Sequence, residues 1–220
     1  MNLPNKITLT RIFMIPVFVA VFYCGLLTPW CYLASAIVFL LAAATDALDG
    51  HIARSRNLVT NFGKFLDPIA DKVLVSTAFI VVLTIPTAFA TNMWGSFGIV
   101  TAGVCIALIL ARELIVSGFR IIAAERSLVL AADKLGKIKT TMQDIAVAFI
   151  LVAMTFIGLG EGGETQGVFS AGVIIAYIGL ACLVICTLLT VISGANYLIK
   201  NKAVLKDEES EQKKREEEQQ

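Results

Sequence analysis

Six long apolar segments recur along the sequence and are separated by short polar connections. Of the 220 residues, 57% are hydrophobic and only 16% are charged, whereas soluble domains have about 45–50% apolar and about 25% charged residues. A helix of about 20 apolar residues is long enough to cross a bilayer. The sequence therefore predicts an all-α integral membrane protein, with six transmembrane helices in one bundle.

The boundaries of these spans follow from turn residues and charges. The third span should open between residues 62 and 67, with Pro68 in its first turn, where a proline is tolerated. The second should carry Asp46 and Asp49 in its last turns. We expect a membrane domain over residues 1–200 and a charged cytoplasmic tail over 201–220, with spans at about 7–27, 31–49, 62–90, 98–124, 141–159 and 168–198.

The basic residues are distributed unevenly over the connections. In a six-span arrangement all 18 Lys and Arg residues fall on one side or at its membrane edge. Connections rich in Lys and Arg stay on the cytoplasmic side of a membrane, so we expect both termini to be cytoplasmic. The apolar run after Arg11 is too long for the core of a signal peptide and is read as the first span. The net charge of +1 gives no indication of nucleic acid as a partner.

The cysteines and the one histidine do not suggest a metal site. All five cysteines lie in apolar segments, without the spacing of a zinc site or of a disulfide framework. His51 lies among the acidic residues, but the helical period turns it away from Asp46 and Asp49. We expect small buried side chains from the cysteines and no ligand from His51.

Four aspartates lie close together at the cytoplasmic ends of the second and third spans. Asp46 and Asp49 are three residues apart, and Asp67 and Asp71 are four apart, so each pair shares a helix face. Converging carboxylates repel one another, and hard divalent cations such as Mg²⁺ or Mn²⁺ relieve this. The pattern predicts a site for two such ions. The alternative is that the aspartates end helices and solvate the membrane interface.

Small residues and one arginine accompany these aspartates. Gly50 and Ala53 have small side chains, so a ligand can come close to that face of the second span, and Gly63 has the same effect on the third. Arg54 offers a planar fork of donors to phosphate oxygens. We expect a phosphate-bearing ligand to lie over these residues.

The ordered set Asp46-x2-Asp49-Gly50-x2-Ala53-Arg54-x8-Gly63-x3-Asp67-x3-Asp71 resembles the defining motif of the CDP-alcohol phosphatidyltransferases at every fixed position. The resemblance implies six transmembrane helices, a homodimer and two Mg²⁺ or Mn²⁺ ions at the cytoplasmic face. It implies that all four aspartates bind the metals and that Asp71 is also the general base. It further implies that the nucleotide diphosphate lies over Gly50, Ala53, Arg54 and Gly63.

Three further stretches bear on the acceptor alcohol. Residues 3–11, 111–126 and 136–143 resemble, in order, the bacterial phosphatidylglycerophosphate synthases of this family. That resemblance implies transfer of a phosphatidyl group from CDP-diacylglycerol to sn-glycerol 3-phosphate. The products would be phosphatidylglycerophosphate and CMP, in the synthesis of anionic phospholipids at the bacterial cell membrane.

A basic set at the cytoplasmic face is consistent with an anionic acceptor. Arg112 and Arg120 are eight residues apart and share a helix face, and Lys137 and Lys139 follow on the next connection. We expect these four residues to bind glycerol phosphate. The alternative is ordinary positive-inside charge that binds lipid headgroups.

The N-terminal segment contributes three more candidates. Asn5, Thr8 and Arg11 could complete the nucleotide or phosphate pocket. Helix capping by Asn5 and anchoring at the membrane surface account for them equally well.

Two other functions remain open. The first is the same chemistry with another acceptor, such as serine, inositol phosphate or phosphatidylglycerol. The second is a small cation-coupled transporter, which intramembrane carboxylates would suit. Transporters usually place such groups near the midplane and have repeated halves, whereas these acids lie at one face and the sequence has no visible repeat.

Overall fold

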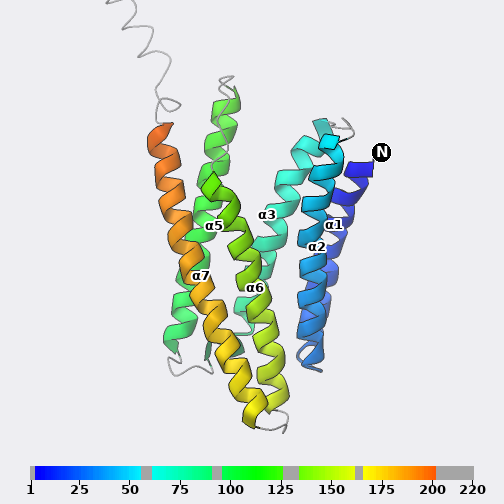
Figure 1. The fold of residues 1–220 in the computed structure, drawn as a ribbon, viewed down its shortest axis with the longest axis vertical. Coiled ribbons are helices and arrows are strands. Elements are labelled where there is room, and N and C mark those ends of the chain that lie inside the picture. Colours follow the sequence, from blue (N-terminus) through cyan, green and yellow to red (C-terminus); the bar gives the residue numbers. More distant parts are fainter. Residues whose placement is uncertain (1–2, 56–60, 91–95, 126–133, 162–165, 202–220) are drawn as a thin grey trace, which may run out of the picture.

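The computed structural model describes residues 3–55, 61–90, 96–125, 134–161 and 166–201, and within them every regular element is a helix. Figure 1 shows long helices running side by side along one axis. The helices are α1 (Leu3–Cys24), α2 (Trp30–Ser55), α3 (Asn61–Thr84), the single turn α4 (Thr87–Ala90), α5 (Ser96–Glu125), α6 (Lys134–Glu161) and α7 (Gln166–Lys200).

Three of these helices are long and apolar enough to cross a membrane, at Ser96–Ala123, Ile138–Glu161 and Gln166–Lys200. The apolar parts of α1, α2 and α3 are shorter, at Thr8–Cys24, Trp30–Thr45 and Lys72–Thr84. These bounds cover only the residues whose side chains the structure describes. The predicted all-helical fold is confirmed for the described residues, and the three long apolar helices are consistent with the predicted membrane protein.

The helices alternate in direction, so their polar ends gather. Figure 1 places the start of α1, the end of α2, the start of α3, the end of α5, the start of α6 and the end of α7 at one end of the bundle. The main packing pairs are α1 with α2 and α6 with α7, and α2 also contacts α6. The aspartate-bearing turns and the basic segments consequently share one end.

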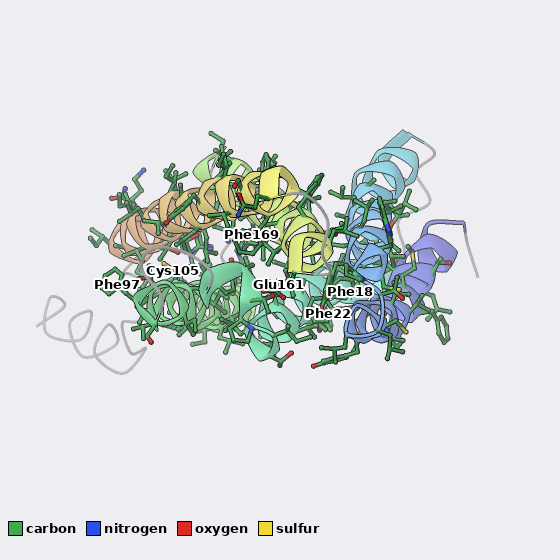
Figure 2. The ribbon with its side chains drawn as sticks, turned by 90° about the horizontal axis from the view of Figure 1, so that it is seen from below. Phe18, Phe22, Phe97, Cys105, Glu161 and Phe169 are labelled. Atoms are coloured by element: carbon green, nitrogen blue, oxygen red, sulfur yellow. The ribbon has the colours of Figure 1, made fainter. Side chains whose placement is uncertain are left out.

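A buried face of α1 packs on α2. Arg11, Ile15, Phe18 and Phe22 recur every three or four residues and are all buried. The Phe18 ring lies 6.0 Å from that of Phe39 on α2, measured between centroids. Figure 2 shows Phe18 and Phe22 on the α1–α2 side and Phe97 and Cys105 on the opposite side. This apolar contact fixes α1 against α2 and carries Arg11 inward on the same face.

The structure corrects the expected end of the third span, the position of Pro68 and the placing of the basic residues before the fifth span. The third span does not run to Ala90, because α3 ends at Thr84 before Pro86, whose ring and missing N–H stop a helix. The helix also begins at Asn61, so Pro68 lies beyond its first turn. The helix α6 contains the span expected at about 141–159, but it begins at Lys134, so Lys137 and Lys139 lie in its first turns rather than in a connection.

Candidate active site

The register of α2 places two aspartates on its buried face. Phe39 and Ala42 are fully buried, and Asp46, Asp49 and Ala53 continue the same spacing of three and four residues. The helix is unbroken to Ser55, so this register holds through the acidic turns. The packing face of α2 thus changes from apolar to acidic as it approaches the polar end of the bundle.

The same change occurs on α3 in the opposite chain direction. Leu74 and Ala78 are buried in the core, and Asp71 and Asp67 precede them at spacings of three and four residues. Because α2 and α3 contact each other and α1, the two acidic faces belong to one part of the bundle. The predicted pairing of carboxylates across two helices is consistent with this register. The four aspartate side chains lie outside the part of the structure that is described.

A buried arginine lies beside the first acidic turn. Arg11 of α1 is 0% exposed, and its Nε donates a hydrogen bond to Oγ1 of Thr45, at 3.4 Å. Thr45 directly precedes Asp46 and donates its own proton to the Ala42 carbonyl, at 2.6 Å. Thr8, one turn before Arg11, is also fully buried. The N-terminal helix therefore brings the cation of Arg11 next to the residue that precedes Asp46.

A second polar group, the basic cluster of Arg112, Glu113, Lys139 and Ser193, joins α5, α6 and α7. Lys139 of α6 is only 3% exposed, and its Nζ donates to Oε1 of Glu113 on α5. The same oxygen lies 3.7 Å from Nη1 of Arg112. Nη2 of Arg112 donates to Oγ of Ser193 on α7, at 3.0 Å. One carboxylate thus contacts two cations inside the bundle, and these three side chains together carry one net positive charge.

This cluster extends to α3 through Lys72, the residue after Asp71. Nζ of Lys72 donates to Oγ of Ser117 on α5, and that hydroxyl donates to the Glu113 carbonyl. A small polar cavity of about 20 Å³ lies between these helices, which is room for one water molecule. Its lining includes Lys72, Ser76, Glu113, Thr140 and Gln143. The helix that carries Asp71 is therefore tied to the basic cluster.

The two predicted arginines of α5 both face α7. The guanidinium carbon of Arg120 lies 5.6 Å from the centre of the Tyr197 ring, which suits a cation–π contact, and Arg112 contacts Ser193. The prediction that they share a helix face is confirmed. Lys137 belongs to the first turns of α6, and its side chain lies outside the described ones.

An apolar cavity of about 510 Å³ lies between α2, α6 and α7. It opens to the surface, because two of its lining residues, Leu40 and Phe149, are 46% and 37% exposed. Ala43 and Ala44 of α2 line it directly before the acidic turns, and Asp144 of α6 adds a carboxylate to its wall. The cavity therefore leads from the apolar surface toward the aspartates.

The chemistry of the four acidic positions fits divalent ions. No group of three or more His, Cys, Asp or Glu side chains meets among the described residues, and the aspartates are outside that set. Their type and placement nevertheless suit oxygen-binding Mg²⁺ or Mn²⁺, because two helices that contact each other each contribute two carboxylates.

Comparison with known proteins identifies the family. Residues 1–185 match the family described as CDP-alcohol phosphatidyltransferase. The chain belongs to this family. The match spans the aspartate motif, α5, α6 and α7 up to residue 185, so every site residue predicted from the sequence lies within the family domain, whereas Ser193 lies beyond it.

Relatives in several bacteria carry one name. The protein named CDP-diacylglycerol–glycerol-3-phosphate 3-phosphatidyltransferase in Bacillus subtilis (strain 168) is 45% identical over 161 residues, covering 69% of this chain and 77% of that protein. Its namesakes in Escherichia coli (strain K12) and Shigella flexneri are 36% identical over 210 residues, covering 94% of this chain and 98% of each relative.

The remaining predicted positions lie in the end turns of α1, α2 and α3. Gly50, Ala53 and Arg54 occupy the last turns of α2, Gly63 lies in the first turn of α3 and Asn5 in the first turn of α1. The side chains of these five residues lie outside the described ones, whereas those of Thr8 and Arg11 are described. Lys72 and Ser117 were not predicted. A lysine directly after Asp71 in an apolar stretch was the signal that could have identified the first.

Proposed function

We propose that this chain transfers the phosphatidyl group of CDP-diacylglycerol to sn-glycerol 3-phosphate, forming phosphatidylglycerophosphate and CMP. The observation that carries this is the 36% identity over 94% of the chain to proteins named for that transfer. The spacing of two aspartates on one face of α2 and two on one face of α3, in helices that contact each other, supports the same chemistry.

The donor end of the site is proposed at the acidic turns. Asp46, Asp49, Asp67 and Asp71 would hold two Mg²⁺ or Mn²⁺ ions, which when bound neutralise diphosphate charge and stabilise the leaving group. Gly50, Ala53 and Gly63 leave room for the diphosphate, and Arg54, with Asn5 and Thr8, would contact the nucleotide. Loss of activity on chelation, and its return with Mg²⁺ or Mn²⁺, would support this; full activity after chelation would contradict it.

The transfer itself needs a base and an in-line approach. Asp71 is proposed to accept the proton of the acceptor's primary hydroxyl. The freed oxygen forms a bond to the lipid-side phosphorus while the phosphoanhydride bond to the cytidylate breaks. CMP leaves with that bridging oxygen, so atoms and charge balance.

The acceptor is proposed to bind at the basic cluster. Arg112, Arg120 and Lys137 would contact the phosphate of glycerol phosphate, while Lys139 adds positive charge from beneath the site. Glu113 already contacts both Lys139 and Arg112 in the structure, so the two cations are held in place before any ligand arrives and one net positive charge remains. A dianionic acceptor gains from such a preformed cluster, and a neutral alcohol does not.

The membrane setting completes the proposal. Six spans, with both termini and the site at the cytoplasmic face of the bacterial cell membrane, would place all 18 Lys and Arg on that side. The acyl chains of the donor CDP-diacylglycerol would bind in the apolar cavity between α2, α6 and α7. We further propose a homodimer, as the family resemblance implies, with residues 201–220 as a cytoplasmic tail.

An acceptor panel tests the proposed function. Purified protein in detergent receives one CDP-diacylglycerol preparation and, separately, glycerol phosphate, serine, inositol phosphate or phosphatidylglycerol, and CMP release is measured. We expect release with glycerol phosphate only. Release with another acceptor alone would reassign the substrate, and release with none would contradict the transfer. Any acceptor-dependent release without a gradient excludes pure cation-coupled transport.

A further inference from the structure

Glu113 occupies the centre of the basic cluster. Its Oε1 accepts a hydrogen bond from buried Lys139 and lies 3.7 Å from the Arg112 guanidinium. Its carbonyl accepts a hydrogen bond from Ser117, which accepts one from Lys72. Three helices, α3, α5 and α6, therefore meet at one acidic residue.

The opposite side of Arg112 is enclosed by α7. Ser193 accepts a hydrogen bond from Nη2, and Gly194 lies directly against the arginine stem. A Cβ added at Gly194 would lie 2.8 Å from Cγ of Arg112, which is closer than real Cβ contacts, and 3.0 Å from its Nε, which is a tight contact. Arg112 therefore lies in a slot whose walls are Glu113, Ser193 and the bare backbone of Gly194.

We infer that Glu113 and Gly194 are positioning residues that fix the Arg112 guanidinium for an anionic phosphate acceptor. The inference rests on the proposed function, in which Arg112 contacts that phosphate. Glu113 orients Arg112 and balances Lys139, and Gly194 leaves the space that the arginine stem fills. Glu113 is also linked, through Ser117 and Lys72, to α3, the helix that carries the proposed base Asp71.

The direction in which removal of the Glu113 carboxylate changes acceptor binding distinguishes a positioning role from simple charge repulsion. If the Glu113 carboxylate merely repelled the acceptor phosphate, its removal would tighten acceptor binding. If it positions Arg112, removal weakens that binding despite the gain in net positive charge. We expect Glu113→Gln to raise the KM for glycerol phosphate about 10-fold, with the KM for CDP-diacylglycerol within about twofold of the parent.

A double-mutant cycle tests whether Glu113 acts through Arg112. In an Arg112→Gln background, Glu113→Gln should change the acceptor KM by less than about twofold, because the group it positions is gone. Independent, additive effects would overturn the inference. Should Glu113→Gln not fold, Glu113→Asp keeps the charge balance with a shorter arm, and it should still raise the acceptor KM. A parent-like KM in that variant would overturn the inference as well.

Gly194→Ala tests the other wall of the slot. The new methyl group must displace Arg112, so the acceptor KM should rise while the donor KM stays near that of the parent. Gly103→Ala on α5 is the matched control, because its added Cβ meets nothing within 4 Å. Equal acceptor KM values in the two variants would overturn the slot. A parent protein without glycerol-phosphate-dependent CMP release would instead refute the proposed function.

Discussion

Nε of Arg11 on α1 donates a hydrogen bond to Oγ1 of Thr45 on α2, at 3.4 Å. The arginine is fully buried, and Thr45 is the residue before Asp46. A buried charge in a membrane bundle is costly unless it is compensated. The contact therefore links the N-terminal helix to the acidic turns through a cation rather than through packing alone.

Arg11→Met should destabilise the protein far more than Thr45→Val. The valine removes one hydrogen-bond acceptor, at a cost of about 1 kcal/mol. The methionine removes a buried positive charge beside the acidic faces, so stability and CMP release should both fall. Thermal unfolding in detergent measures the difference, and equally mild effects would show that the charge of Arg11 has no role there.

Asp71→Asn should abolish turnover while donor binding survives. Without a base, kcat should fall by about 10²–10⁴-fold, whereas CDP-diacylglycerol should still bind in an equilibrium assay. Glu161→Gln is a matched control, because Glu161 ends α6 at the opposite end of the bundle. Near-parent turnover in Asp71→Asn would remove the base assignment.

Arg112→Ala and Lys137→Ala should raise the KM for glycerol phosphate more than the KM for CDP-diacylglycerol. Each substitution removes a cation proposed to contact the acceptor phosphate. Lys200→Ala, at the end of α7, is the control for a general loss of positive charge. Steady-state kinetics with each substrate varied in turn provides the test, and a larger effect on the donor would place these residues in the other half of the site.

Ala148→Phe should impair use of the lipid donor. Ala148 lines the cavity between α2, α6 and α7, and a phenyl ring there would fill space proposed for acyl chains. Ala181→Phe is the matched control, because Ala181 lines a separate apolar cavity of about 440 Å³ between α5 and α7. The KM for CDP-diacylglycerol should rise only in Ala148→Phe. The opposite pattern would assign the lipid to the α5–α7 cavity.

The helices were predictable from the sequence because long apolar runs have few alternatives in a membrane. Their ends were less so. Pro86 stops α3 ahead of an apolar stretch that favoured continuation, and polar residues such as Lys137 continue α6 although the hydropathy pattern begins only later. Hydropathy marks where a helix is apolar, not where its hydrogen bonding ends.

The aspartate motif was visible because its spacing lies within two helices. The partners of Lys139 were not, because Glu113 is 26 residues away along the chain, and the two residues meet only in the folded bundle, where α7 packs on both α5 and α6. The same holds for Lys72 and Ser117, which are 45 residues apart. Local periodicity predicts which face a residue occupies, but not which residue on another helix it meets.

The most direct test follows the fate of the acceptor phosphate. Purified protein in detergent with Mg²⁺ receives unlabelled CDP-diacylglycerol and sn-glycerol 3-phosphate carrying ³²P, and label in the lipid phase is measured. The proposed transfer predicts lipid-soluble label that appears mole for mole with CMP and disappears in Asp71→Asn. Label that stays in the aqueous phase while CMP is released would contradict it, because the acceptor would then not be glycerol phosphate.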